Sequence, residues 1–391
     1  MSDRLLVTPS PHLKAEEDIG EIMKGVCIAL LPAFAFALYR FGYWSWVVTI
    51  LAVGAAVATE AACQRLRRRP VTVDDWSAVV TGLLLAAVLP PNVAWYVPVI
   101  GSVFAIGVGK QCFGGLGANV WNPALLGRAF LQAAFPTWIN SGQWPAAKPE
   151  TFVGAMGTSV RGAFGDLVER AGTTGADIIT SASPLEQLAK AKQLAALPAA
   201  DGAAEAVGAA AAGLPEIFVR DGVLHVAPGQ ILDVFLGNTV GCIGEVSALA
   251  LLLGGLYLLA RNLIGWRIPL LYIATVAVLG WALPAPYIST EGGAAYTHWF
   301  TGPALLHVVG GGLFIGAFFM ATDMVTSPMT PRGQTLFAIG CGVLTAVIRL
   351  YGGYPEGVCY SILLMNTVVP LIDAWTRPRV YGKTPRDSAT T

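Results

Sequence analysis

The sequence predicts an all-α integral membrane protein with about ten transmembrane helices, arranged as two inverted five-helix repeats with broken or re-entrant segments, plus one long extracytoplasmic loop. Three observations support this fold class. Hydrophobic residues make up 55% of the chain and charged residues only 12%, with a mean hydropathy of +0.62, which is too apolar for a soluble domain. The apolar residues form runs near the length of roughly 20 residues that a membrane-crossing helix needs. Glycine and proline interrupt several of these runs, as expected for discontinuous helices.

Hydropathy and charge divide the chain into five regions. The first is polar and has no apolar stretch behind basic residues, which argues against a cleavable signal peptide. The predicted regions are a cytoplasmic N-terminal segment (1–20), a first transmembrane half (21–136), an extracytoplasmic loop (137–228), a second transmembrane half (229–376) and a cytoplasmic tail (377–391).

The candidate spans are apolar runs, several of them short or broken. Pro123, Gly127 and the run Gly237–Gly244 mark the expected breaks. The spans are expected at 22–41, 43–63, 77–91, 94–110, 119–136, 229–260, 268–284, 302–322, 334–350 and 356–375.

The distribution of basic residues predicts the orientation, because cytoplasmic loops keep an excess of Lys and Arg. With both termini inside, the cytoplasmic segments collect Arg65, Arg67, Arg68, Arg69, Lys110, Arg261, Arg267, Arg332, Arg377, Arg379, Lys383 and Arg386. The loop 137–228 then lies outside and separates the two halves. An odd number of spans in each half inverts one half relative to the other, and such halves form binding sites at the midplane. The formal net charge of zero gives no reason to expect nucleic acid as a partner.

Ionisable residues inside apolar spans are the candidate functional residues, because they are costly unless they face a cavity or a partner. They are Glu60, Arg128, Glu245, Asp323, Arg349 and Asp373. We interpret Glu245, beside a helix break, as part of an ion path or cofactor environment, with a structural hydrogen bond as the alternative. Asp323 and Asp373 are also ion-path candidates, or else capping carboxylates near helix ends. Arg128 and Arg349 either pair with these acids, contact a bound cofactor or extend towards the membrane surface.

No metal site and no catalytic residue is predicted from the remaining side chains. The six cysteines are scattered singly without metal-ligand spacing and are interpreted as small buried hydrophobes. His307 is interpreted as a packed core histidine. No nucleophile–base arrangement and no dinucleotide-binding motif is present.

The segment Asp177–Leu185 forms a hydroxyl-rich turn in the predicted outer loop. Locally it suits a helix start, with Ser183 as N-cap and Pro184 at the first helical position. A plain transporter has no evident need for such a turn.

Several longer motifs resemble the RnfD/NqrB family, the membrane subunits of the Rnf ferredoxin:NAD oxidoreductase and of the sodium-pumping NADH:quinone oxidoreductase. The resemblance covers nearly the whole chain and is weakest in the Ala-rich part of the long loop. It is carried by Ser10–His12, Thr81–Pro91, Gly109–Gly117, Asn122–Phe130, Phe319–Gln334, Arg349–Gly357 and Leu363–Asp373.

This resemblance implies that a flavin transferase attaches FMN through its phosphate to the hydroxyl of Ser183. The matching motif residues are Asp177, Thr180, Ser181 and Ala182. Ser183 stands where Thr is more frequent, which keeps the oxygen nucleophile, and Ser181 stands where Gly is usual, which narrows the available backbone turns.

The resemblance also implies the remaining cofactor and the partners. Noncovalent riboflavin is expected near the turn Thr326–Arg332 and the Gly-rich loop after Lys110. The partners are the other Rnf subunits, including a second FMN-carrying subunit and iron–sulfur subunits, together with Na⁺ or H⁺ and membrane lipid. The expected location is the bacterial inner membrane, with the long loop periplasmic or extracellular.

The predicted function is therefore a flavoprotein subunit that passes electrons between ferredoxin and NAD and couples this to Na⁺ or H⁺ translocation. A channel or secondary transporter without a redox role is the alternative, since it would also have inverted repeats and intramembrane carboxylates. A purely structural anchor for other redox subunits is a third interpretation if Ser183 is unmodified.

Overall fold

The computed structural model describes residues 18–139, 217–220, 223–226, 228–237, 241–288, 294–352 and 356–377, which are mainly helical. The first half contains α1 (Ile19–Phe41), α2 (Trp44–Leu66), η1 (Val73–Asp75), α3 (Ser77–Ala87), α4 (Tyr96–Ile106), η2 (Gly107–Gln111), α5 (Pro123–Ala134) and α6 (Pro136–Ile139). The second half contains α10 (Pro228–Leu236), α11 (Ala248–Ala260), α12 (Arg267–Ala282), α13 (Ala304–Val309), α14 (Leu313–Ile315), η4 (Gly316–Met320), α15 (Pro331–Tyr351) and α16 (Val358–Thr376).

The membrane character of the chain is confirmed, whereas the count of about ten spans stays a prediction. Within the described residues, four helices are long and apolar enough to cross a bilayer, namely those at Ile19–Phe41, Tyr43–Leu66, Pro331–Tyr351 and Val358–Thr376. Other apolar helices are shorter. The 11 residues of α3 extend only about 17 Å, which is little more than half of the hydrocarbon core.

The helical class of the fold is confirmed. Two short antiparallel hairpins accompany the helices, in which β1 (Ile217–Arg220) pairs with β2 (Val223–Val226) and β3 (Pro286–Ile288) pairs with β4 (Ala294–Tyr296). The expected span 302–322 needs correction, because it is not continuous. It divides into α13, α14 and η4 because Gly310, Gly311 and Gly312 separate them, and Gly311 adopts a φ of 70° that favours glycine.

Helix starts in both halves follow the local sequence. Asn122 caps α5 by accepting hydrogen bonds from the next two available backbone amides, and Pro123 occupies the first turn. At the start of α15 the hydroxyl of Thr330 accepts from the backbone amide of Gly333, and Pro331 occupies the first turn. Ser247 caps α11, so the second half resumes its helix where the Gly-rich interruption ends. These residues satisfy helix-terminal amides that lipid cannot satisfy.

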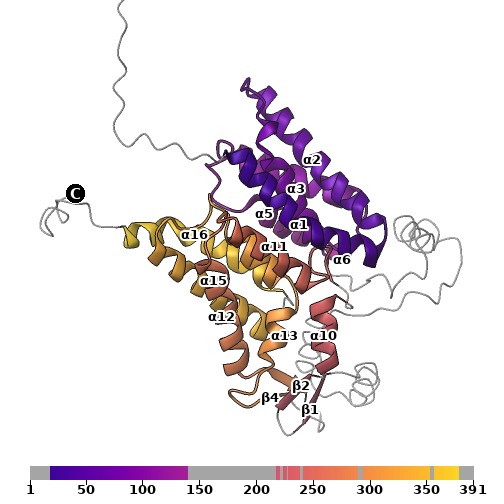
Figure 1. The fold of residues 1–391 in the computed structure, drawn as a ribbon, viewed down its shortest axis with the longest axis vertical. Coiled ribbons are helices and arrows are strands. Elements are labelled where there is room, and N and C mark those ends of the chain that lie inside the picture. Colours follow the sequence, from indigo (N-terminus) through magenta and orange to yellow (C-terminus); the bar gives the residue numbers. More distant parts are fainter. Residues whose placement is uncertain are drawn as a thin grey trace, which may run out of the picture.

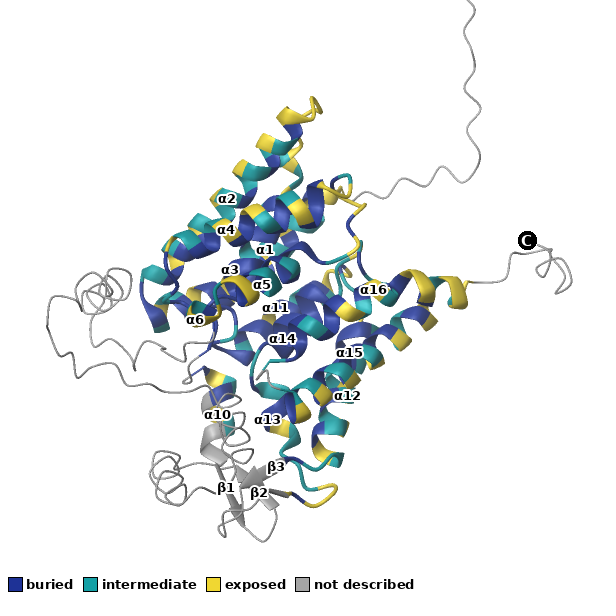
Figure 2. Ribbon diagram, turned by 180° about the vertical axis from the view of Figure 1, so that it is seen from behind, coloured by how far each residue is buried: buried dark blue, intermediate teal, exposed yellow. Residues whose placement is uncertain are grey.

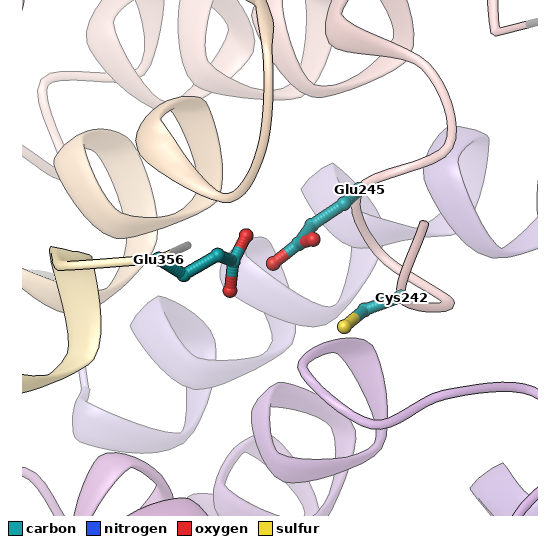
Figure 3. A group of neighbouring side chains, drawn as sticks. All are labelled: Cys242, Glu245 and Glu356. Carbon is teal, nitrogen blue, oxygen red and sulfur yellow. The ribbon is translucent and has the colours of Figure 1, made fainter. Parts of the chain in front are cut away.

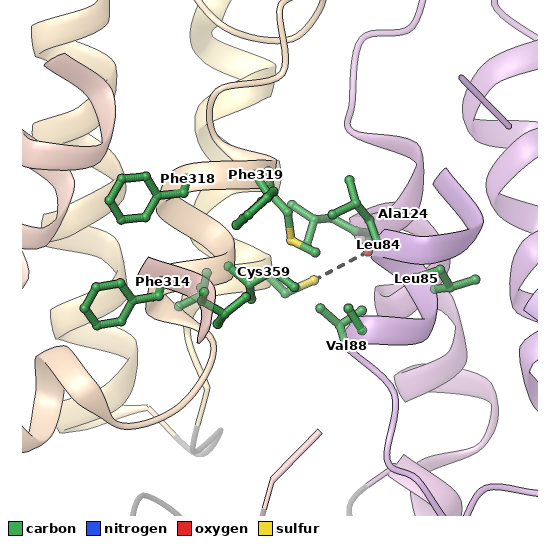
Figure 4. Packing of buried hydrophobic residues seen from close by; sticks show 14 of the residues in the cluster. Leu84, Leu85, Val88, Ala124, Phe314, Phe318, Phe319 and Cys359 are labelled. Carbon is green, nitrogen blue, oxygen red and sulfur yellow. Dashed lines mark hydrogen bonds between the residues drawn. The ribbon is translucent and has the colours of Figure 1, made fainter. Parts of the chain in front are cut away.

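The two halves pack against each other through one continuous apolar core. The helices of the first half gather on one side of the molecule and those of the second half on the other, with α11 lying beside α1 (Figure 1). At this interface Leu84, Leu85 and Val88 of the α3 region belong to the same buried cluster as Phe314 and Phe318, with Phe319 and Cys359 between the two groups (Figure 4). The thiol of Cys359 donates to the backbone carbonyl of Leu125 at 3.4 Å, which links α16 to α5.

The outer faces of the long helices are apolar as well as exposed (Figure 2). Ile50 of α2 is 62% exposed, and Leu364 and Trp375 of α16 are 53% and 77% exposed. Large exposed apolar side chains on successive turns are unfavourable in water but suit contact with lipid. The burial pattern therefore supports a multi-pass membrane protein.

Candidate functional site

An irregular segment from each half meets the other in the interior of the protein. In the first half, residues 88–95 separate α3 from α4, and in the second half residues 241–247 precede α11. The backbone amide of Ile243 donates to the carbonyl of Leu89 at 3.0 Å, and that of Gly244 donates to Ala87 at 2.7 Å. The two breaks thus satisfy each other's polar backbone groups, which is required where non-helical backbone lies at membrane depth.

Gly244 makes this close approach possible. A Cβ atom at this position would lie 2.6 Å from the Cβ of Ala87 and 3.0 Å from the carbonyl oxygen of Ala87. A larger residue would push the two irregular segments apart. Gly244, the last glycine of the Gly237–Gly244 run, is therefore needed for the two halves to pack closely at Ala87.

Arg128 of α5 extends into this junction and joins both halves. Its guanidinium donates to the carbonyl of Val88, to the sulfur of Cys242 at 3.5 Å and to a carboxylate oxygen of Glu356 at 2.8 Å. The Arg128 side chain is 8% exposed. Removing only one partner of such a buried pair is strongly destabilising, because the other charge stays buried without compensation.

Both oxygens of Glu356 accept hydrogen bonds. Oε2 accepts from Arg128, and Oε1 accepts from the backbone amide of Gly312 at 2.9 Å. Glu356 lies just before α16, whereas Gly312 lies just before α14. The carboxylate of Glu356 is therefore held from two sides by donors on different elements.

Glu245 and Cys242 complete the cluster. One ligand atom from each of Cys242, Glu245 and Glu356 lies within 4.8 Å of the other two, and the three side chains point towards one another (Figure 3). We call Arg128, Cys242, Glu245 and Glu356 the junction cluster. Two carboxylates at this separation favour uptake of a proton or a hard cation, because like charges repel in a low dielectric.

Arg349 of α15 supplies a second buried guanidinium near the junction cluster. It donates to the backbone carbonyls of His307 and Gly310, which belong to the interrupted span. His307 is 2% exposed, in agreement with its interpretation as a core residue. The sequence suggested that the arginines pair with Asp323 or Asp373, but in the structure Arg128 pairs with Glu356.

A cavity of about 90 Å³ lies between the two π-helical segments, η2 of the first half and η4 of the second. This volume is enough for several water molecules. Each π-helix changes the direction in which its side chains project, and such segments are frequent at functional sites. The cavity has apolar walls that include Val80, Leu84, Phe318 and Phe319, and polar walls that include Ser77, Thr81, Lys110, Asn119, Asn122 and Asp323.

Lys110 of η2 lines this cavity as a buried charge. Its ammonium lies 2.7 Å from Oε1 of Glu60, with side-chain exposures of 2% and 1%, and it donates to the hydroxyl of Ser77 at 2.5 Å. Gln111 donates to the same Glu60 carboxylate at 3.1 Å. Lys110 is therefore a buried, paired charge of η2, and its assignment to the cytoplasmic side stays a prediction. Glu60 and Ser77 provide the partners that let the ammonium leave water.

The other ion-path candidates are Asp323 and Asp373. Asp323 lies on the segment between η4 and α15, and Asp373 of α16 packs against that segment. Asp323 lines the cavity and accepts from the amide of Val325 at 3.3 Å and the hydroxyl of Thr326 at 3.2 Å. Asp373 accepts from the amide of Met329 at 3.2 Å. Neither belongs to the junction cluster, so the structure places these two ion-path candidates apart from Glu245.

Glu356 was not predicted as a functional residue from the sequence, although it lies in the motif Arg349–Gly357. The available signal was an acid at the first residue of the predicted span 356–375, because a carboxylate is favourable near a helix N-terminus. The flavin motif residues Asp177, Thr180, Ser181, Ala182 and Ser183 lie outside the described residues.

Comparison with known proteins gives a near full-length match. The profile of the NQR2, RnfD, RnfE family covers residues 6–382. The D-subunit of the Na(+)-translocating ferredoxin:NAD(+) oxidoreductase complex of Acetobacterium woodii is 42% identical over 97% of this chain and 96% of its own length. The D-subunit of the proton-translocating ferredoxin:NAD(+) oxidoreductase complex of Clostridium ljungdahlii is 41% identical over 96% of each chain. The D-subunit of the ion-translocating oxidoreductase complex of Stutzerimonas stutzeri is 42% identical over 94% of this chain and 93% of its own length.

Proposed function

Because the chain belongs to the NQR2, RnfD, RnfE family, we propose that it is the D-subunit of an ion-translocating ferredoxin:NAD oxidoreductase complex. The observation that carries this proposal is the match to the D-subunits of such complexes over nearly the whole length of both chains. The multi-pass helical architecture agrees with it. The activity belongs to the whole complex, with iron–sulfur subunits and a second FMN-carrying subunit as partners.

Electrons pass through FMN that a flavin transferase attaches to Ser183. Support comes from the hydroxyl-rich motif Asp177–Ser183 and from its place in the predicted outer loop. When bound, the flavin supplies one- and two-electron redox chemistry, and the protein supplies attachment and orientation. A covalent phosphoester to this chain also separates the proposal from the channel or transporter alternative.

The cavity between η2 and η4 is the proposed site of noncovalent riboflavin. Its chemistry fits a flavin ring, which needs apolar faces and polar partners at its edge, because the lining includes Phe318 and Phe319 together with Asn119, Asn122 and Lys110. Riboflavin is larger than the cavity, so binding requires the rim to widen. Leu116 and Met324 are 38% and 55% exposed and belong to the rim, and a methionine adapts readily to a ligand.

Ion translocation is proposed to use Glu245, with Asp323 and Asp373 as further carboxylates nearer the cytoplasmic side. Carboxylates inside membrane helices typically mark ion paths. The two relatives at 42% and 41% identity bear names that specify different ions, so the proposal includes both Na⁺ and H⁺.

Mass spectrometry of the peptide from Asp177 to Lys190 tests the flavin proposal. We expect the peptide to carry the mass of FMN on Ser183 in protein made with its flavin transferase. Acid precipitation of the same sample should leave FMN with the protein and release riboflavin into the supernatant. An unmodified peptide from such material would contradict covalent attachment, and a supernatant without flavin would contradict the riboflavin site.

Labelling with an impermeant thiol reagent tests the orientation, which places both termini inside and the loop 137–228 outside. A Gly202→Cys variant should be labelled in intact cells of the bacterial host, if needed after permeabilising an outer membrane. Cys112 serves as an internal control, because it is exposed and lies next to Gln111, whose carbonyl accepts a hydrogen bond from Arg67. Cys112 should be labelled only after the inner membrane is opened. Labelling in the reverse order would overturn the orientation, and cysteines introduced at Arg67 and Lys383 should behave like Cys112.

A further inference from the structure

We propose that the junction cluster is an asymmetric carboxylate pair, in which Glu356 is a positioning residue held in its ionised form and Glu245 is the member that exchanges the coupled cation. This inference rests on the proposed ion-coupled function and deepens it. The cation is H⁺ or Na⁺, which a single carboxylate in a polar pocket can exchange.

The asymmetry follows from the donors that each carboxylate receives. Glu356 accepts from the Arg128 guanidinium at 2.8 Å and from the Gly312 amide at 2.9 Å, so both oxygens are engaged by donors that favour the charged form. Glu245 instead faces the Glu356 carboxylate and the Cys242 thiol within the same 4.8 Å cluster. Arg128 is committed to Glu356, so Glu245 needs a proton or a metal cation to balance its charge.

Gly312 brings the two carboxylates together. Its amide donates to Glu356, while a Cβ atom at this position would lie 2.6 Å from Oε1 of Glu245. The glycine thus lets Glu245 approach the backbone from one side while Glu356 binds it from the other. Because Gly312 belongs to the interrupted span, the pair lies where broken segments of both halves converge.

Charged and titratable groups on all the neighbouring elements must be considered for a cation-exchange site. Those facing the pair are Arg128 of α5, Cys242 of the irregular segment, Arg349 of α15 and Cys359 of α16. Arg349 already donates to two backbone carbonyls. Arg128 therefore controls which carboxylate is paired, and replacing Glu356 should transfer Arg128 to Glu245.

The test measures the half-saturating cation concentration of ion-coupled turnover in vesicles that contain the whole complex, normalised to the amount of assembled complex. One series titrates Na⁺ at fixed pH, and the other titrates pH in Na⁺-free choline buffer. Glu245→Gln should abolish the cation dependence in whichever series the wild type shows one. Glu356→Gln should keep the dependence but raise the half-saturating concentration at least about tenfold, or ~1.4 kcal/mol, because the cation must now displace Arg128 from Glu245.

The double variant Arg128→Gln/Glu356→Gln separates positioning from folding. It removes both charges of the fixed ion pair, so Glu245 is again without its competitor and the half-saturating concentration should return to the wild-type value or below it. If Glu356→Gln does not assemble, the double variant provides the decisive value. Ser361→Ala is the control, since Ser361 is a buried hydroxyl that bonds Tyr272 and Thr345 away from the cluster. It should change the yield without moving the half-saturating concentration.

The outcomes distinguish this inference from the proposed function. A normal half-saturating concentration in Glu356→Gln, a double variant with the cation dependence lost or its half-saturating concentration still raised, or exchanged roles for the two glutamates would overturn the asymmetric pair. Normal cation dependence in Glu245→Gln would overturn both the pair and the proposed ion path through Glu245. Failure to find FMN on Ser183 would overturn only the covalent flavin.

Discussion

Replacing Ser183 with alanine is expected to remove covalently bound FMN from the chain completely. The phosphoester needs a hydroxyl oxygen, and alanine offers none. Ser183 lies in the predicted outer loop, away from the apolar spans, so the membrane helices should fold as before. Flavin fluorescence of the band on a denaturing gel measures the loss, and protein staining of the same band gives the amount of chain.

Two neighbouring variants serve as matched controls for this result. Ser183→Thr should keep the flavin, because threonine retains the attacking oxygen. Ser181→Gly should also keep it, since it removes an adjacent hydroxyl and restores the residue that is usual in the resembling family. A fluorescent band in Ser183→Ala would move the attachment to another residue, and its loss in Ser181→Gly would assign that role to Ser181.

Replacing Lys110 with methionine is expected to lower the free energy of unfolding by roughly 3 kcal/mol, the lower end of the cost of breaking a buried ion pair. The variant leaves the Glu60 carboxylate, which is 1% exposed, without its cationic partner. We expect the lower end because Gln111 and Gln64 still donate to Glu60 at 3.1 and 3.4 Å. Thermal unfolding of the purified complex in detergent, followed by tryptophan fluorescence, measures the change as a lower midpoint.

The double variant Lys110→Met/Glu60→Gln is the control for charge. It leaves no unpaired charge, and glutamine keeps most of the hydrogen-bonding capacity of Glu60, so most of the lost stability should return. Equal destabilisation in the single and double variants would show that packing around Lys110, and not its charge, holds η2 against α2. A change of riboflavin content in the single variant would report separately on the cavity that Lys110 lines.

The sequence alone was sufficient for the class of the protein and for much of its local structure. Apolar runs identified the four long helices, and the interruption expected near Gly237–Gly244 separates α10 from α11. The break expected at Pro123 is where α5 begins, but the break expected at Gly127 was wrong, because α5 continues from Pro123 to Ala134. Apolar runs and helix boundaries depend on residues that are close in the sequence, so they can be predicted without knowing the tertiary structure.

Segment lengths and the course of short connections were less predictable. Continuous apolar composition suggested one span at 302–322, but three glycines divide it into short helices. The strand pairs β1–β2 and β3–β4 lie in regions that the sequence predicted as connections between spans. The pairing of these strands depends on the geometry of the turns between them, which the spacing of apolar residues does not predict.

The sequence by itself thus determined the membrane character, the family, the interruption near Gly237–Gly244 and six of the costly charges, but not Lys110 or Glu356. Only the tertiary structure decided how those charges combine. Arg128 pairs with Glu356, 228 residues away, and Lys110 pairs with Glu60, 50 residues away. The physical reason is that a buried charge takes the partner that packing brings within hydrogen-bond distance, and this choice is made between elements that are far apart in the chain. The same packing sets the two π-helical segments around one cavity and brings Glu245 beside a carboxylate that Arg128 already holds.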